Sequence, residues 1–180
     1  NGETLKLLHE LGACRWVLPA ELSRDMLAAL QARRPHGMET EVQVFGRLPL
    51  ALSARCFTAR AHHLPKDECE FRCRDYPDGL PLATREGQRF LTINGIQTQS
   101  GSTSCLVAEL PELRAIGVDV LRLSPQAHGM HDIVQVFREV LDGRLAPVAA
   151  EARLAVHMPD GACNGYWHGE PGMDWQPHAG

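Results

Sequence analysis

Apolar residues recur at helical spacing in several separate parts of the chain. Leu5, Leu8 and Leu11 form one such stripe, which ends before Gly12. The same spacing predicts helices over residues 21–33, 106–117 and 133–143, each followed by a glycine or a proline-containing turn. A further helix is predicted after Ser53, and it carries Cys56.

Short apolar runs between these stripes predict strands over residues 14–18, 42–45 and 118–123. Two more runs, 82–85 and 89–93, predict a β-hairpin that turns at Glu86–Gln88. The polar stretch from Asn94 to Ser104 follows this hairpin and precedes a helix. Two interpretations stay open for it: a loop that binds a polar substrate near a helix N-terminus, or a solvated loop.

Helix and strand alternate with short connections, which favours parallel βαβ units and an α/β fold. The pattern supplies three or four parallel strands, whereas a closed (β/α) barrel takes about 250 residues. We therefore predict the C-terminal half of a TIM-like (β/α) barrel, with an inserted cysteine region and β-hairpin. This partial barrel domain spans residues 1–158. Residues 159–180 are predicted to be an irregular tail, packed through Tyr166, Trp167 and Trp175.

Composition narrows the classes of function. Hydrophobic residues make up 44% of the 180 residues, enough for a core, and the net charge is −4. With no basic stripe, a nucleic-acid partner is not expected. No run of 18 apolar residues occurs, so no transmembrane segment is predicted. The chain begins abruptly with a helix and without a secretory signal, which predicts a piece of a longer cytoplasmic protein with reduced or metal-bound cysteines.

Three of the six cysteines fall close together, as Cys56, Cys69 and Cys73 with the spacing C-x12-C-x3-C. Gathered thiolates suit zinc or an iron–sulfur cluster. On a helical turn the last two would share one face. The alternative is a set of buried apolar cysteines, which suits Cys14 beside Trp16. It does not suit Cys69 and Cys73, whose neighbours are mostly charged.

Three thiolates leave a four-ligand site one ligand short. His62 or His63 could complete a zinc site, which would make the chain a zinc-stabilised binding module. A cysteine paired with a histidine could also act as a nucleophile, as in a cysteine peptidase-like hydrolase. Nothing in the sequence ties one cysteine to one base, so catalytic residues stay unassigned.

The stretch from Glu41 to Thr58, the C-x12-C-x3-C spacing and the run from Cys163 to Gly169 together resemble one known family. They are similar to the collagenase-like peptidase U32 family, in its branch of accessory proteins of oxygen-independent ubiquinone biosynthesis. The resemblance implies that Cys56, Cys69 and Cys73 are metal ligands of a 4Fe–4S cluster, with the fourth ligand upstream of this sequence.

The resemblance also implies a function and partners. The chain would be an iron–sulfur subunit of an anaerobic hydroxylase that acts on ubiquinone precursors, with a UbiU-like paralogous subunit as its heterodimer partner. A lipid-carrier protein is one route by which the precursor would arrive. Two departures matter: Pro49 stands where the family usually has a cysteine, and Ser124-Pro125-Gln126 replaces an acidic and basic motif. Peptidase activity is therefore not expected, and catalysis by this chain alone is in doubt.

Overall fold

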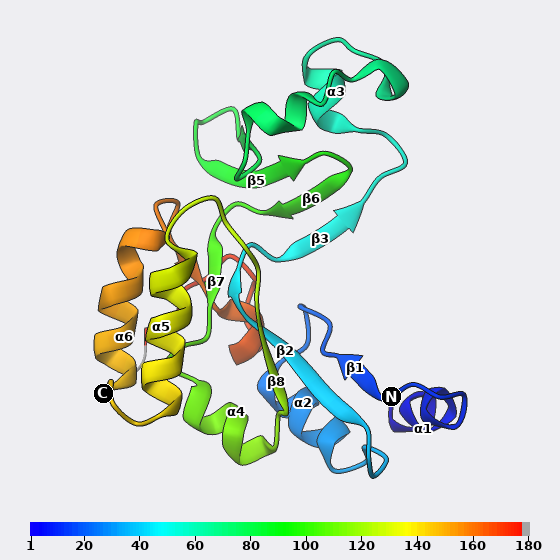
Figure 1. Ribbon diagram of the computed structural model, residues 1–180, viewed down its shortest axis with the longest axis vertical. Coiled ribbons are helices and arrows are strands. Elements are labelled where there is room, and N and C mark those ends of the chain that lie inside the picture. The colour runs from blue at the N-terminus through cyan, green and yellow to red at the C-terminus, as the bar shows by residue number, and fades with distance from the viewer. Residues whose placement is uncertain (178–180) are drawn as a thin grey trace.

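The structure is a computed structural model that describes residues 1–177. It is a mixed α/β protein with two separate sheets. Figure 1 shows the smaller sheet above the larger one, with most helices gathered around the larger sheet. The smaller sheet and the cysteine region are inserted between two strands of the larger sheet.

The larger sheet is built around β2 (Glu39–Gly46). Two strands pair with it in parallel, β1 (Arg15–Val17) and β8 (Val120–Leu123). Its C-terminal end pairs antiparallel with β7 (Thr103–Cys105), which pairs in parallel with β9 (Ala162–Cys163). The alternation seen in the sequence thus yields three adjacent parallel strands.

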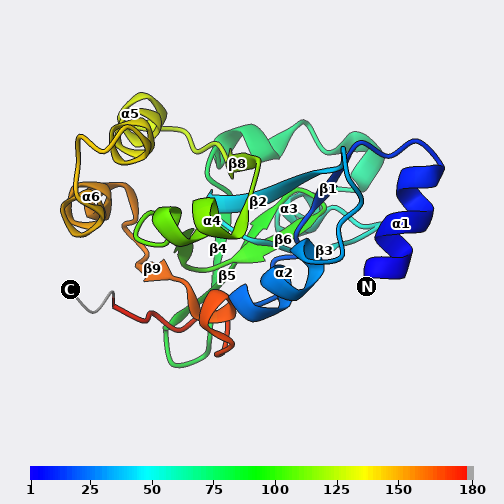
Figure 2. The ribbon, with the colours of Figure 1, turned by 90° about the horizontal axis from the view of Figure 1, so that it is seen from below.

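Five α-helices accompany this sheet: α1 (Gly2–Glu10), α2 (Arg24–Gln31), α4 (Leu110–Ile116), α5 (Met130–Leu141) and α6 (Pro147–Leu154). The last four pack in a row, α2 on α4, α4 on α5 and α5 on α6. Figure 2 shows α1 at the opposite end from α5 and α6. The main core lies between the row of helices and the sheet, where the Phe45 and Phe137 rings meet edge to face at 5.9 Å.

The smaller sheet is antiparallel, in the order β3 (Pro49–Leu52), β6 (Gln97–Ser100), β5 (Arg89–Asn94) and β4 (Leu80–Ala83). The two ends of this insertion meet at Leu48 and Ser100. The Ser100 amide donates to the Leu48 carbonyl over 3.0 Å, and the Leu48 amide donates to Ser100 Oγ over 2.9 Å. The insertion therefore begins and ends at one place on the larger sheet.

Most predicted elements are present, and the protein combines α-helices with β-sheets. The half-barrel stays a prediction, because the larger sheet does not close on itself within residues 1–177. Trp167 is buried in the core and Trp175 packs against it, which confirms the packing predicted for the tail. The tail is less irregular than predicted, since it contributes β9 and a 3-10 turn at Gly165–His168. The three residues after Pro177 lie outside the described part.

Four local predictions were wrong. Asn94–Ser104 is not a loop: it contains β6 and most of β7, because main-chain pairing makes strands of this polar stretch. The strand β3 was missed. The helix predicted from residue 106 begins at Leu110, after a bend and turn that are themselves buried. Cys14 is exposed rather than buried. No helix among residues 1–177 is long and apolar enough to cross a lipid bilayer.

Candidate functional site

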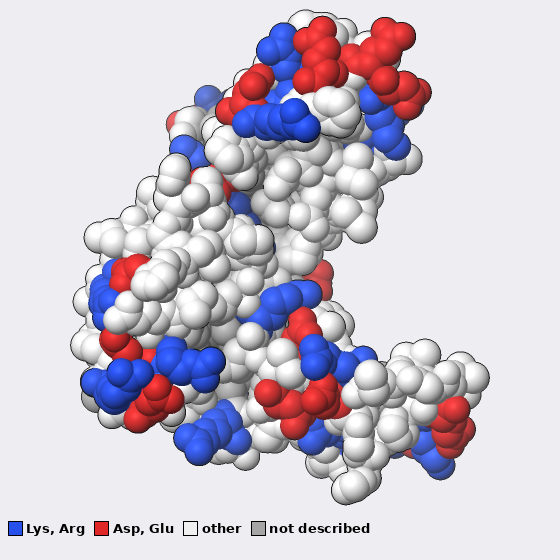
Figure 3. Space-filling model, in the orientation of Figure 1, with Lys and Arg blue, Asp and Glu red and all other residues white. Residues whose placement is uncertain are grey.

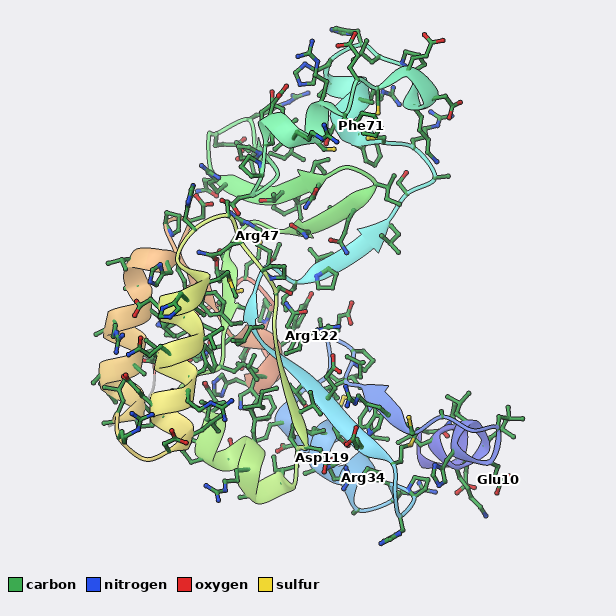
Figure 4. All side chains as sticks on the ribbon, viewed as in Figure 1. Glu10, Arg34, Arg47, Phe71, Asp119 and Arg122 are labelled. Carbon is green, nitrogen blue, oxygen red and sulfur yellow. The ribbon has the colours of Figure 1, made fainter. Side chains whose placement is uncertain are left out.

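The three predicted ligand cysteines lie in one small unit, residues 56–76, which we call the cysteine module. It holds α3 (Phe57–Ala61) and two 3-10 turns, at Lys66–Glu68 and Arg72–Asp75. Figure 4 places Phe71 of this module at the far end of the inserted part. Figure 3 shows acidic and basic side chains gathered over the same end.

Cys56 begins the module as the N-cap of α3, and its Sγ accepts a hydrogen bond from the Ala59 amide over 3.4 Å. Glu70 and Phe71 then take positive φ angles of 52° and 53°, which reverse the chain. This reversal separates Cys69 from Cys73, so they do not share one helical face as predicted. It also brings the second 3-10 turn against α3. The segment that carries Cys69 and Cys73 thus forms a compact turn rather than a helix.

At the end of the module, the ring of Tyr76 contacts the ring of His62, which follows α3. His62 Nε2 and the Tyr76 hydroxyl are 3.1 Å apart, and their rings lie 5.7 Å apart. His63 is exposed in a left-handed conformation at φ 58°. One of the two ring nitrogens of His62, Nε2, is therefore engaged by Tyr76.

The thiols have the chemistry that an iron–sulfur cluster requires. All three are free, Cys56 and Cys69 are half-buried, and Cys73 is exposed. Within residues 1–177, no group of three or more His, Cys, Asp or Glu side chains is already placed to hold a metal ion. The donor set therefore fits a cluster in ligand type and in confinement to one module, and ligation would require the turn at Glu70–Phe71 to rearrange.

A cavity of about 290 Å³ opens on the larger sheet, and we call it the front cavity. Figure 3 shows the molecule hollowed on this side, between the inserted part and α1. Its apolar walls come from the β1–α2 connection, β2, the start of β3 and the tail, among them Leu18, Leu48, Pro49, Leu106 and Trp167. A Cβ atom at Gly172 would lie 2.3 Å from the Tyr166 ring, so this glycine lets the ring form part of the wall.

Polar groups reach the front cavity from two strands. Arg122 of β8 donates to Gln43 Oε1 of β2 over 3.1 Å and lies 3.5 Å from Glu41. The amide nitrogen of Gln43 donates to the Arg47 carbonyl over 3.1 Å, which fixes its orientation. Figure 4 shows Arg122 beside β2 and β8 of the larger sheet. Ser104 of β7 also lines the cavity.

A second cavity, of about 340 Å³, lies between the inserted part and the larger sheet; we call it the junction cavity. Here Asp160 accepts from both Arg47 and Arg89, the latter over 3.0 Å. Ser124 and Gln126 line the same cavity, and Gln126 donates to the carbonyls of His128 and His157. The carboxyl ends of β2 and β8 meet here, which is where a parallel sheet usually places its site.

Residues 1–177 match Peptidase family U32. The chain belongs to this family. No solved structure matched the chain.

In this U32 chain, the residues that depart from the family pattern lie at the two cavities. Pro49 lines the front cavity, and Ser124, Pro125 and Gln126 line the junction cavity. Sequence reasoning thus identified positions near the cavities, although it could not bring them together. The family match covers the cysteine module as well.

Sequence reasoning missed Glu109, a buried carboxylate of this U32 chain. Asn164 Nδ2 donates to its Oε1 over 3.2 Å, and His168 Nε2 lies 3.3 Å away. Its other oxygen has no partner among residues 1–177. Burial raises the pKa of Glu109, against the opposing hydrogen bonds from Asn164 and His168. The signal was present as a lone acid within the apolar run from Leu106 to Leu110.

The two buried cysteines, Cys105 and Cys163, are unsuited to nucleophilic catalysis. Burial raises the pKa of the Cys105 thiol to about 12 and that of Cys163 to about 11. A nucleophilic cysteine needs its thiolate form near neutral pH. A peptidase mechanism through either thiol is therefore disfavoured.

Proposed function

We propose that this U32 chain is a UbiV-like iron–sulfur subunit of an oxygen-independent hydroxylase acting on ubiquinone precursors. Cys56, Cys69 and Cys73 would hold a 4Fe–4S cluster, with the fourth ligand supplied from outside the described residues. The observation that carries the proposal is the confinement of three free, accessible thiols to one small module. Membership of Peptidase family U32 supports it.

A bound 4Fe–4S cluster would supply one-electron transfer. The protein's own contribution is to present the thiols at the end of an inserted sheet. Cys56 is set by the N-cap of α3, while Cys69 and Cys73 lie on either side of the turn at Glu70 and Phe71. Binding of the cluster would require this turn to rearrange so that the thiols form a common ligand shell.

A paralogous UbiU-like subunit is part of the proposal. At the carboxyl end of β8, Ser124 and Pro125 carry no charge, and the Gln126 amide nitrogen is engaged with the main chain at His128 and His157. Preorganised charge usually supplies several kcal/mol of transition-state stabilisation. A partner that carries charged groups at the corresponding loop would provide what this chain lacks.

The test is anoxic purification of the full-length protein, followed by iron, sulfide and zinc analysis and visible absorption. We expect a brown protein with iron and sulfide. We expect Cys56→Ala, Cys69→Ala and Cys73→Ala each to lose most of the absorption, because an iron without its thiolate is open to solvent. Cys14→Ala is the matched control, since Cys14 is also exposed but lies outside the module.

Stoichiometric zinc without sulfide would reject the cluster in favour of a zinc-stabilised module. Absorption that survives Cys69→Ala but not Cys14→Ala would reject the ligand assignment. The partner is tested by product formation from a ubiquinone precursor under anoxia, with each subunit alone and both together. We expect product only from the pair, and full turnover by this chain alone would contradict the partner proposal.

A further inference from the structure

Residues 163–176 close on themselves beside the front cavity, and we call them the tail strap. The Asn164 amide donates to the Asp174 carbonyl over 3.0 Å, and the Asn164 side chain exchanges two hydrogen bonds with the main chain of Gln176, over 2.9 and 2.7 Å. Several residues of the strap line the front cavity, among them Tyr166, Trp167 and Gly172. A movement of the strap would therefore open one wall of that cavity.

A buried carboxyl group holds the strap to the body of the protein. Glu109, which directly precedes α4, is only 4% exposed. Its Oε1 accepts from Asn164 Nδ2 over 3.2 Å and lies 3.3 Å from His168 Nε2. Its Oε2 has no hydrogen-bond partner among residues 1–177. Both side-chain partners of this carboxyl come from the strap, so the closed strap separates it from solvent.

The charge of Glu109 decides how well this contact is satisfied. An ionised carboxylate leaves a charged oxygen, Oε2, buried without a donor, which is costly. A neutral carboxyl can carry its proton on Oε1 and donate it to His168 Nε2, which leaves only a neutral carbonyl oxygen unpaired. In agreement with this geometry, burial raises the pKa of Glu109, against the opposing hydrogen bonds from Asn164 and His168. The closed strap therefore favours the protonated form.

The surroundings of Glu109 offer little positive charge to offset its ionisation. The titratable and charged groups around Glu109 and the adjoining thiols come from five parts of the fold: His168 of the strap, Cys105 of β7, Cys163 of β9, Glu151 of α6 and Arg47 after β2. Burial raises the pKa of Cys105 to about 12 and that of Cys163 to about 11, so both thiols are neutral near pH 7. Arg47 is paired with Asp160. His168 would offset an ionised Glu109 only when it is itself protonated.

We propose that Glu109 and the tail strap form a pH-sensitive gate on the front cavity, which is closed while Glu109 is protonated and opens when Glu109 ionises. On opening, the proton passes to solvent and the carboxylate gains the water that the closed strap withholds. Because the closed form has the raised pKa, the strap is held fully below the ordinary pKa of a glutamate, about 4.3, and this hold is lost as the pH rises through the pKa of the closed form. The gate does not involve the cysteine module and is independent of the proposed cluster.

The experiment measures hydrogen exchange of the full-length protein by mass spectrometry at several pH values between about 5 and 9. The rates are corrected for the intrinsic pH dependence of amide exchange, and β2 serves as the internal reference. We expect exchange in residues 163–176 to quicken relative to β2 as the pH rises, by up to about tenfold per pH unit, the limit for release of one proton. A constant ratio of the two rates across this range would overturn the gate.

Glu109→Gln tests the carboxyl group directly. Glutamine has nearly the same shape and stays neutral, so the strap should exchange slowly at every pH and the pH dependence should disappear. Glu112→Gln is the matched control, because Glu112 lies on the same helix but is exposed and pairs with Arg24. It should keep the pH profile of the unchanged protein. A Glu109→Gln profile as steep as that of the unchanged protein would overturn the proposal.

A second variant separates the carboxyl group from its histidine partner. His168→Gln keeps a polar side chain beside Glu109 but removes the other group that can titrate in this contact. We expect the acceleration of strap exchange with pH to persist in this variant, because Glu109 remains. Loss of the pH dependence in His168→Gln would assign the gate to the histidine and overturn the role of Glu109.

Discussion

The cysteines of this chain differ in their environment: some are buried in the core and others are exposed to solvent. Cys105 and Cys163 lie in the core, where burial raises the pKa of both thiols. Cys14 and Cys73 are exposed. The same side chain is therefore a small apolar group at two positions and an accessible sulfur at two others.

Alkylation should distinguish these environments. With iodoacetamide at pH 8 and after chelation of any metal, Cys14 and Cys73 should be modified first. Cys105 should stay unmodified, because a thiol of pKa about 12 is only about one part in 10⁴ thiolate at that pH. Peptide mass spectrometry measures the order in which the cysteines are alkylated. In denaturant, all of them should be alkylated at similar rates. Modification of Cys105 as fast as Cys73 in the folded protein would contradict the assignment.

At the scale of elements, β2 is the strand on which the larger sheet depends, because β1, β7 and β8 all pair with it. Asp119, which directly precedes β8, binds the N-terminal end of β2. Its carboxylate accepts from the Thr40 amide over 2.8 Å and from Arg34, and Figure 4 shows Arg34 and Asp119 side by side. The Thr40 hydrogen bond, with help from Arg34, lowers the pKa of Asp119.

Asp119→Asn should therefore destabilise the fold, by about 1 kcal/mol after allowance for solvent screening at this exposed group. The folded pKa of Asp119 is depressed, so its contribution is fully present above the unfolded value of about 3.9 and is lost as the pH falls through the folded pKa. Urea midpoints at pH 7 and pH 3 measure this. Asp25→Asn, at an exposed pair with Arg24, should have almost no effect at either pH. If Asp119→Asn lowers stability as much at pH 3 as at pH 7, the charge of Asp119 is not the cause of the effect.

Periodicity predicted the helices and the apolar strands because their side chains decide whether they are buried. Periodicity failed to predict strands that are formed by main-chain hydrogen bonds rather than by burial of apolar side chains. The polar β6 is held by pairing with β3 and β5, and β3 is held in turn by β6. For the site, charged neighbours correctly indicated that Cys69 and Cys73 are not core residues. The left-handed turn at Glu70 and Phe71 left no signal, because neither residue type favours positive φ.

At the scale of the whole molecule, one carboxylate joins the inserted part to the larger sheet. Asp160 follows α6 in the chain and accepts from Arg47, at the base of the insertion, and from Arg89 of β5. Its side chain is only 11% exposed and that of Arg47 is 17% exposed. Figure 4 shows Arg47 at the junction between the two sheets.

Asp160→Asn should loosen this junction, because it leaves the mostly buried Arg47 without its counter-charge. We expect a loss of roughly 2 kcal/mol in stability. Hydrogen exchange should quicken in β3, β5 and β6 more than in β2. Asp142→Asn, which breaks an exposed pair with Arg144, is the control and should change neither quantity. Uniform acceleration across both sheets would mean that Asp160 supports the whole fold rather than the junction.

The meeting of Leu48 and Ser100 at the base of the inserted sheet has a consequence for how the gene could change. Two backbone positions that already exchange hydrogen bonds can be bridged by a short turn. A single deletion between them would remove β3 to β6 together with Cys56, Cys69 and Cys73, and the path of the chain from β2 to β7 would be kept. The reverse event could graft the same cassette onto a relative that lacks it. The site of the proposed cluster could then be gained or lost in evolution as one unit, without redesign of the sheet that receives it.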